Sequence, residues 1–149
     1  IVNELEHQKQ VLRETQTAEI FESRKGLATM LYQLTEKTKP GDERLFFSMN
    51  VAHKNKEIQD FFKETISAKE QAKKLAVKGL ASKGFEPLFK TRSYIKMKYT
   101  NLPFPSNVTI CNDKVCFIAW DDIPVGYLIH SRQIAQIFKE FFNAVWELS

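Results

Sequence analysis

The sequence predicts a mixed α/β domain in which helices flank one sheet, preceded by a polar linker helix. Segments with strand and helix patterns alternate as β-α-β-α-β-α before a strand-rich stretch and a closing helix. The apolar run from Arg44 to Met49 is typical of a strand buried on both faces. The closing helix has apolar residues at almost every i, i+3 and i+4 position, a pattern typical of a helix packed against a core.

Length and composition indicate one ordinary globular domain. The 149 residues are long enough to bury roughly two-thirds of their unfolded surface, so folding needs no disulfide or metal. Hydrophobic residues make up 43% of the chain and charged residues 27%, and 12 phenylalanines indicate a Phe-rich core. No stretch approaches the ~20 apolar residues that span a bilayer, and no charged-then-apolar pattern in these residues suggests secretion. We therefore expect a cytoplasmic protein that does not enter membranes.

The positive charge is spread along the chain. The formal net charge is +4, and its mild clusters are Lys73-Lys74 and the two lysines of Lys96-Met97-Lys98. A dedicated nucleic-acid binder concentrates its positive charge on one face. We therefore expect these lysines to be solvated surface residues.

Residues 1–16 predict a linker and dimerisation helix. Val2, Leu5 and Leu12 are apolar, and most of the other residues are charged or carry amides. The alternating spacings of four and three resemble the seam of a weak coiled coil, formed by Ile1, Leu5, Gln8, Leu12 and Thr15. Such a helix cannot bury enough surface alone. It needs a partner, which is its own domain, a preceding domain or the same helix of a second subunit. Because the chain starts at Ile1 and enters the helical pattern at once, we expect a preceding domain to have been removed.

Residues 17–149 hold the predicted sheet and its helices. Hydrophobic periodicity and turn residues delimit each element. The predicted strands cover residues 17–22, 44–49, 75–80, 94–99, 108–111, 115–120 and 125–129. The predicted helices run from an N-cap at Ser23 to about residue 38, over 54–72, over a short segment in 83–92, and from a cap at Ser131 onward.

The two cysteines, Cys111 and Cys116, flank a short turn. If the turn centres on Asp113-Lys114, the two face each other across a hairpin and a disulfide is geometrically possible. Two reduced, half-buried thiols are the alternative. A zinc site needs two more ligands, and the three histidines are not spaced to supply them, so we expect no metal.

No complete catalytic motif is present. The sequence lacks GxSxG, GxGxxG, GxxxxGK[ST] and HExxH. Of its histidines, His7 lies on the polar first helix and His130 at a turn, whereas His53 follows a buried strand together with Asn50. Because ligands bind beyond the carboxyl ends of strands in α/β sheets, His53 is the histidine best placed to touch a ligand.

The other polar candidates are individually unspecific. Asp121-Asp122, beside Trp120, fits either an acid–base or metal pair or an ordinary turn. Trp120 fits either stacking on a sugar or other ring, or a place in the core. Arg92 could pair with an anionic ligand, and Ser106-Asn107 are lone polar groups in a loop.

Two stretches carry a resemblance to a known family. The run SNVTICNDKVCFIAWDDIPVGYLIHSRQIAQIFKEFFNAVW resembles the C-terminal part of a phospholipase D-type domain, with its hairpin, apolar strand and closing helix. The run AEIFESRKGLATMLYQLTEKTKPGDERLFF resembles the opening of the same domain. Both are especially similar to the version found in TrmB-type transcriptional regulators, mostly of archaea. The resemblance covers essentially the chain from Thr17 onward.

The resemblance implies a domain that has lost its chemistry. Phospholipase D enzymes use H-x-K-x-x-x-x-D, with histidine as nucleophile and lysine binding phosphate. Setting the aspartate on Cys111 places the lysine at Ser106 and the histidine at Phe104, so all three are lost. Shifting the alignment by one residue does not restore the set, because no histidine lies between His53 and His130. In the regulators, a winged helix-turn-helix reads DNA and a coiled linker joins it to the effector domain.

We therefore expect an effector-sensing and dimerisation domain of a transcriptional regulator, without catalysis or cofactor. Its expected partners are a second copy of the chain, a small-molecule effector such as the sugars that some relatives sense, and DNA through an N-terminal domain absent from this chain. The candidate ligand-binding residues are Asn50, His53, Arg92, Phe104, Ser106, Trp120 and Asp121. Two alternatives remain: a divergent hydrolase that uses His53, Asp121 and Asp122, and an interaction module without a ligand.

Overall fold

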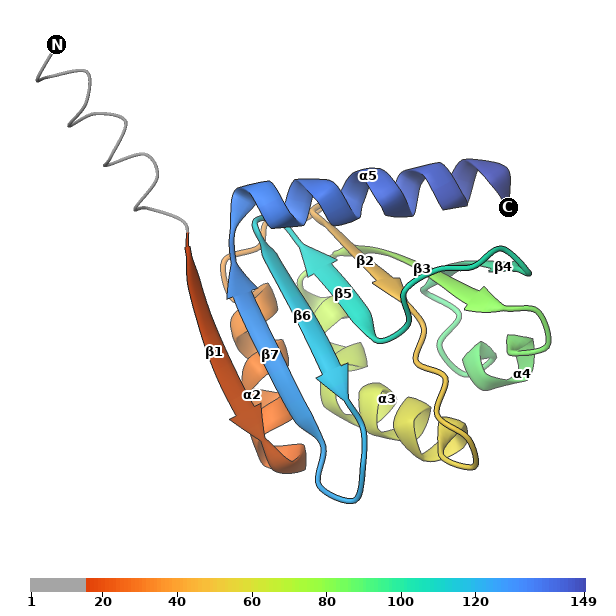
Figure 1. Ribbon diagram of the computed structural model, residues 1–149, viewed down its shortest axis with the longest axis horizontal. Helices are drawn as coiled ribbons and strands as arrows, with labels where there is room; N and C mark the ends of the chain where they lie inside the picture. The colour runs from red at the N-terminus through yellow and green to blue at the C-terminus, as the bar shows by residue number, and fades with distance from the viewer. Residues whose placement is uncertain (1–15) are drawn as a thin grey trace, which may run out of the picture.

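The computed structural model describes residues 16–149 and arranges them around one seven-stranded sheet (Figure 1). Across the sheet the strand order is β1-β7-β6-β5-β2-β3-β4. In chain order the elements are β1 (Thr17–Glu22), α2 (Ser23–Thr35), β2 (Glu43–Phe47), α3 (Asn55–Ala72), β3 (Ala76–Ser82), α4 (Glu86–Phe89), β4 (Lys96–Thr100), β5 (Val108–Cys111), β6 (Lys114–Ala119), β7 (Val125–His130) and α5 (Arg132–Leu148). The predicted mixed α/β fold is confirmed.

The sheet has a parallel half and an antiparallel half. β2, β3 and β4 run parallel, and α3 and α4 lie in the connections that return the chain to the start of each next strand. β5, β6, β7 and β1 each pair antiparallel with their neighbour, and β5 pairs antiparallel with β2. The carboxyl ends of β2 and β6 and the start of β5 therefore meet at one edge of the sheet.

Helices cover both faces of the sheet (Figure 1). α2 and α3 pack on one face and α5 packs on the other, because residues alternate between the two faces along each strand. The cluster under α2 and α3 includes Leu27, Met30, Leu31, Ile58, Phe61, Ile66, Cys111, Cys116, Ile118, Trp120 and Leu128. The cluster under α5 includes Leu45, Phe47, Leu80, Val108, Ile110, Val115, Phe142, Val145 and Trp146.

The apolar stripe of α5 predicts only part of the helix surface that is buried. Ser131 caps the helix as predicted, because its hydroxyl accepts a hydrogen bond from the Ile134 backbone N–H at 3.2 Å. Phe142 is fully buried. Ile137 and Phe141 belong to the same predicted stripe but are 56% and 44% exposed. The stripe is therefore wider than the face that the sheet covers.

The helix boundaries differ from the prediction by a few residues. Ser23 is the first residue of α2 and Glu22 holds the N-cap position, but the Ser23 hydroxyl makes the capping bond that was predicted for it, accepting from the Gly26 backbone N–H at 3.3 Å. α2 ends at Thr35, three residues early, and the free Thr35 carbonyl accepts bonds from the Thr38 hydroxyl at 2.7 Å and the Lys73 ammonium at 2.8 Å. The short helix predicted in 83–92 is the single turn α4.

The hairpin of the two cysteines excludes the disulfide alternative. Cys111 pairs with Lys114 and Cys116 with Thr109, so the turn centres on Asn112-Asp113 and the cysteines do not face each other. Asn112 adopts a positive φ of 52°, which asparagine tolerates in such turns. Both thiols are free and fully buried, more deeply than the half-buried pair expected.

The lysine clusters divide between solvent and helix ends. Lys74 and Lys96 are exposed, as predicted. Lys73 and Lys98 are half-buried instead, because each donates to a carbonyl at the end of a helix: Lys73 to α2, as described above, and Lys98 to Trp146 at 2.9 Å.

Two further predictions concern membrane spans and the N-terminal linker helix. Among residues 16–149, no helix has the length and apolarity needed to cross a membrane. The predicted linker and dimerisation helix, with Val2, Leu5 and Leu12, lies outside the described residues.

Candidate functional site

Six of the seven predicted ligand-binding residues lie in loops at the same edge of the sheet. Asn50 and His53 follow β2, Phe104 and Ser106 precede β5, and Trp120 and Asp121 follow β6. The register aligns the three strand ends, because Phe47 pairs with Val108 and Val108 pairs with Phe117. The sequence placed only His53 at a strand end by argument, and the structure brings the other two loops to the same edge.

The two aromatic candidates are part of the core. Phe104 is half-buried and stacks on Phe47, with ring centroids 5.6 Å apart. Trp120 is 7% exposed, and its ring meets Phe61 edge-on at 5.4 Å. The Arg24 guanidinium lies 5.3 Å from the centroid of the Trp120 ring. Of the two roles left open for Trp120, packing in the core is the one observed.

The polar candidates at this edge are exposed and make local bonds. The Asn50 side-chain oxygen accepts from the Asn55 amide at 3.4 Å, and Asp122 lies 3.4 Å from the Lys54 ammonium. His53 is exposed and has a positive φ of 65°. Among the described residues, no group of three or more His, Cys, Asp or Glu side chains is placed to hold a metal ion.

Arg92 lies apart from the other candidates, in a buried polar cluster between α3 and the sheet. We call Arg44, Glu70, Arg92 and Tyr94 the arginine cluster. Arg44 and Glu70 form a bidentate ion pair that includes a 3.0 Å bond from Nη2 to Oε1. Arg92 Nη2 lies farther from the same carboxylate, at 3.8 Å from Oε1. The Tyr94 hydroxyl donates to Glu70 Oε1 at 2.7 Å.

Neutral side chains complete the bonding of the two arginines. Arg44 Nη1 donates to the Thr109 hydroxyl at 3.1 Å. Arg92 donates from Nε to the Ser67 hydroxyl at 3.1 Å and from Nη1 to Gln59 Oε1 at 3.2 Å. The side chains of Arg44, Arg92 and Glu70 are 4%, 3% and 1% exposed, so three ionised groups lie beyond the reach of bulk water.

The pKa values in the arginine cluster follow from this arrangement. Burial opposes the ionised form of Glu70, but the charge and hydrogen bonds of Arg44 and the hydroxyl of Tyr94 outweigh it, so the Glu70 pKa is lowered. Burial lowers the pKa of Arg92, and the like charge of Arg44 contributes in the same direction. Arg44, which holds the carboxylate directly, has a raised pKa despite its burial.

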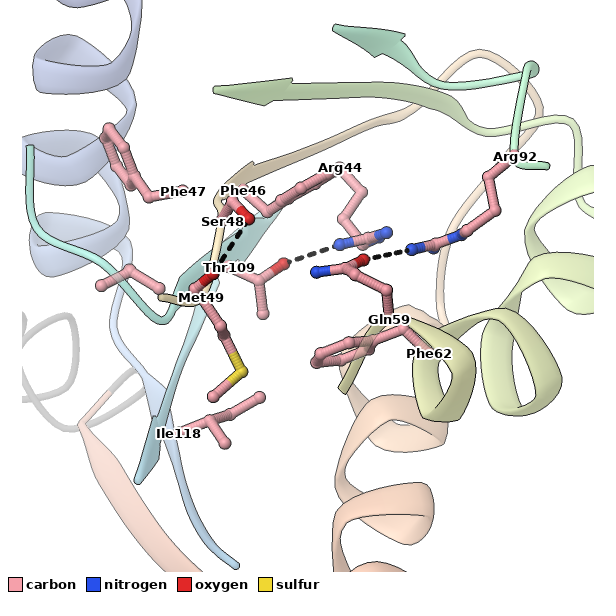
Figure 2. Close-up of a pocket in the computed structure, with 11 residues that line it drawn as sticks. Arg44, Phe46, Phe47, Ser48, Met49, Gln59, Phe62, Arg92, Thr109 and Ile118 are labelled. Atoms are coloured by element: carbon pink, nitrogen blue, oxygen red, sulfur yellow. Dashed lines mark hydrogen bonds between the residues drawn. The ribbon is translucent and has the colours of Figure 1, made fainter. Parts of the chain in front are cut away.

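A cavity of about 30 Å³ borders the arginine cluster (Figure 2). Its polar lining comes from Arg44, Arg92, Gln59, Ser48 and Thr109, and its apolar lining from Phe46, Phe47, Met49, Phe62, Val108 and Ile118. A site that holds one water needs at least about 10–15 Å³, so the cavity has room for two or three atoms of that size. A sugar does not fit it as it stands.

Sequence reasoning found Arg92 but missed the other members of the arginine cluster. Two signals pointed to them. Arg44 begins the run that predicted a strand buried on both faces, so its side chain had to be buried with it. Glu70 continues the i, i+4 series of Ile58, Phe62 and Ile66 on α3, so a carboxylate occupies a core position of that helix.

The three positions that the resemblance assigns to the catalytic motif are far from a catalytic arrangement. Phe104 packs on the core, and Ser106 is an exposed loop residue. Cys111 ends β5, at the opposite end of the strand from Ser106, and burial raises the pKa of its thiol to about 11. A buried neutral thiol does not substitute for an ionised aspartate.

Comparison with known proteins establishes the fold. No protein-family model and no curated protein matches the sequence. Among solved structures, the chain superposes on phospholipase D-type folds over most of its length. The chain therefore has the phospholipase D-like fold, in the form that TrmB-type proteins also contain.

Three individual structures illustrate this likeness. TrmBL2, an archaeal chromatin protein whose structure shows a novel mode of DNA binding, aligns with a TM-score of 0.57 and 18% identity. That alignment covers 97% of this chain and 58% of TrmBL2, so the chain spans little more than half of that protein. Nuc, a phospholipase D family member from Salmonella typhimurium, gives 0.59 at 15% identity over 89% of this chain and 95% of Nuc. NucT from Helicobacter pylori gives 0.54 at 13% identity over 89% and 96%.

Proposed function

We propose that this domain is a non-catalytic effector-sensing and dimerisation domain of a cytoplasmic transcriptional regulator. The observation that carries the proposal is the state of the three motif positions: Phe104 is packed in the core, Ser106 is uncharged, and Cys111 is a buried thiol with a raised pKa. None of them supplies a nucleophile or a phosphate-binding cation. The fold shared with the DNA-binding protein TrmBL2 supports the role in regulation.

The proposed effector binds at the edge formed by the loops after β2 and β6 and before β5. Asn50, His53, Ser106 and Asp121 are exposed there and offer hydrogen-bonding groups to a ligand such as a sugar. Trp120 lies beneath this surface and supports it by packing. Thermal unfolding in the presence of a metabolite library tests the proposal, since a ligand at a hundredfold excess over Kd adds about 2.7 kcal/mol to the free energy of unfolding. An absence of any stabilising metabolite would favour an interaction module without a ligand.

An apolar surface that no other part of residues 16–149 covers supports dimerisation. Phe117, Tyr127 and Ile20 form one row across β6, β7 and β1 on the face that carries α5. Phe138 of α5 covers Phe117, and the two rings meet edge-on with centroids 5.4 Å apart. Tyr127 and Ile20, in contrast, are 41% and 66% exposed. A second copy of the chain would bury this row.

Sedimentation equilibrium tests the dimer. We expect Ile20→Lys and Tyr127→Lys to shift the chain toward monomer, because each places a charge in the proposed interface. Tyr32→Lys is the matched control, since Tyr32 is 50% exposed on α2, the helix on the opposite face of the sheet. A wild-type chain that stays monomeric at all concentrations would contradict dimerisation by this domain.

A divergent hydrolase is the competing function. The Lys54–Asp122 contact brings the His53 loop next to the acidic turn at Asp121-Asp122, so a histidine and two carboxylates lie in neighbouring loops. We expect no hydrolysis of bis(p-nitrophenyl) phosphate above background with Mg²⁺, Mn²⁺ or Zn²⁺. Turnover by the wild-type chain that is lost in His53→Ala would establish the hydrolase instead.

A further inference from the structure

The arginine cluster is not electrically balanced. It contains two guanidinium groups and one carboxylate, and all three side chains are at most 4% exposed. Tyr94, the remaining titratable member, is neutral, since burial raises its pKa. Arg44 holds both oxygens of Glu70, while Arg92 approaches only one of them, at 3.8 Å. Arg92 therefore lacks a counterion of its own among the described residues.

Hydrogen-bond donors are also left over. The two guanidinium groups carry ten N–H bonds. Six side-chain hydrogen bonds account for donors on these groups: three from Arg44, to Glu70 and Thr109, and three from Arg92, to Ser67, Gln59 and Tyr94. Four N–H bonds thus have no acceptor among the described residues. Buried donors of charged groups are costly to leave unpaired, so the site favours an acceptor, and a negatively charged one most of all.

The cavity beside the arginine cluster is amphipathic. Both arginines and the Gln59 amide line one side, while Met49, Phe62 and Ile118 line the other (Figure 2). Its volume of about 30 Å³ suits a molecule of only a few non-hydrogen atoms. A single negative charge neutralises the cluster, and the apolar wall accommodates a C–H or methyl group beside it.

We propose that this cavity binds a small monocarboxylate of the size of formate, with acetate as its upper limit. Its carboxylate accepts hydrogen bonds from the free N–H groups of Arg92 and Arg44, and its C–H or methyl group packs against Met49, Phe62 and Ile118. The proposal rests on the arginine cluster alone and is independent of any role in regulation. It concerns a site separate from the open edge that carries His53 and Ser106.

Thermal unfolding of the 149-residue chain tests the ligand chemistry. Sodium formate and sodium acetate are compared with sodium chloride at equal ionic strength and with formamide and acetamide, which have the same shapes and no charge. We expect the two carboxylates to raise Tm saturably, by about 3–6 °C at a tenfold excess over Kd. A response equal to that of chloride, or one that the amides reproduce, would overturn the proposal.

An isosteric variant tests the location without removing an arginine. Gln59 Oε1 already accepts from Arg92, so Gln59→Glu supplies a carboxylate in place and neutralises the cluster. We expect Gln59→Glu to raise Tm and to abolish the response to formate. Gln71→Glu makes the same charge change at an exposed position of α3 and is expected to leave the Tm and the formate response unchanged. A Gln59→Glu variant that keeps the formate response, or that lowers Tm, would contradict the proposal.

Discussion

Removing the carboxylate from the arginine cluster is the sharpest test of its energetics. Glu70→Gln keeps the shape of the side chain but leaves Arg44 and Arg92 buried without any negative charge. Breaking a buried ion pair by removing one partner costs about 3–5 kcal/mol, because the other charge stays desolvated and unpaired. With Glu70 only 1% exposed, solvent screening does not reduce this cost. For a domain of this size the loss corresponds to a fall in Tm of about 6–20 °C.

The pH dependence of the free energy of unfolding is a second, independent measure of the contribution of Glu70. The Glu70 pKa is lowered from its ordinary value of 4.5, so the folded state binds this proton less readily than the unfolded chain does. The stability that Glu70 contributes is therefore complete above about pH 4.5 and is lost as pH falls through the lowered pKa. Glu70→Gln is expected to lose this part of the acid sensitivity.

Urea unfolding as a function of pH measures both effects. Glu64→Gln is the matched control, because Glu64 is an exposed carboxylate on the same helix, and we expect it to change the free energy of unfolding by no more than about 0.5 kcal/mol. A Glu70→Gln variant destabilised by less than about 1 kcal/mol at pH 7 would refute the argument, since the two guanidinium groups would then not need the carboxylate.

Three further predictions concern the packing of the sheet. Gly126→Ala places a Cβ 2.5 Å from Met30 Sδ and is expected to destabilise the fold by about 1–3 kcal/mol in urea unfolding, whereas a loss below about 0.5 kcal/mol would show that α2 moves away freely. Ser131→Ala removes the α5 cap and is expected to cost about 1 kcal/mol by the same assay, with Ser131→Asp restoring most of it. Cys111 and Cys116 are expected to resist a thiol reagent at pH 8 until the chain unfolds: with a pKa of about 11, only about one Cys111 thiol in a thousand is ionised, and burial raises the Cys116 pKa as well. Rapid labelling of the folded chain would contradict this.

Local patterns in the sequence predicted the elements of the fold because each pattern has a local physical cause. The hairpin at Asn112 and the cap at Ser131 depend on backbone conformation and one side-chain bond, so both could be predicted from adjacent residues. The exposure of Ile137 and Phe141 could not, because it depends on how much of α5 the sheet covers. Periodicity gives the apolar width of a helix but not the width of its partner.

The sequence could predict a candidate-site residue only where its position follows from the order of strands and loops. The rule that ligands bind beyond the carboxyl ends of strands picked out His53 alone, and the structure brings the loops of Ser106 and Asp121 to the same edge of the sheet. In the arginine cluster, Arg44 bonds to Glu70, 26 positions away, and to Thr109, 65 positions away. Such pairings follow from tertiary packing, and a single sequence shows only that each of these polar residues lies in a segment with a buried pattern.

DNA binding by the whole protein that contains this domain tests the central proposal most directly. The affinity of the whole protein for the DNA upstream of its own gene would be measured at a fixed salt concentration, with and without a metabolite that raises the Tm of the domain. A sensing domain predicts sequence-selective binding that the metabolite changes about 5- to 150-fold, equivalent to a coupling free energy of about 1–3 kcal/mol. Binding without sequence preference, or an affinity that the metabolite leaves unchanged, would contradict it.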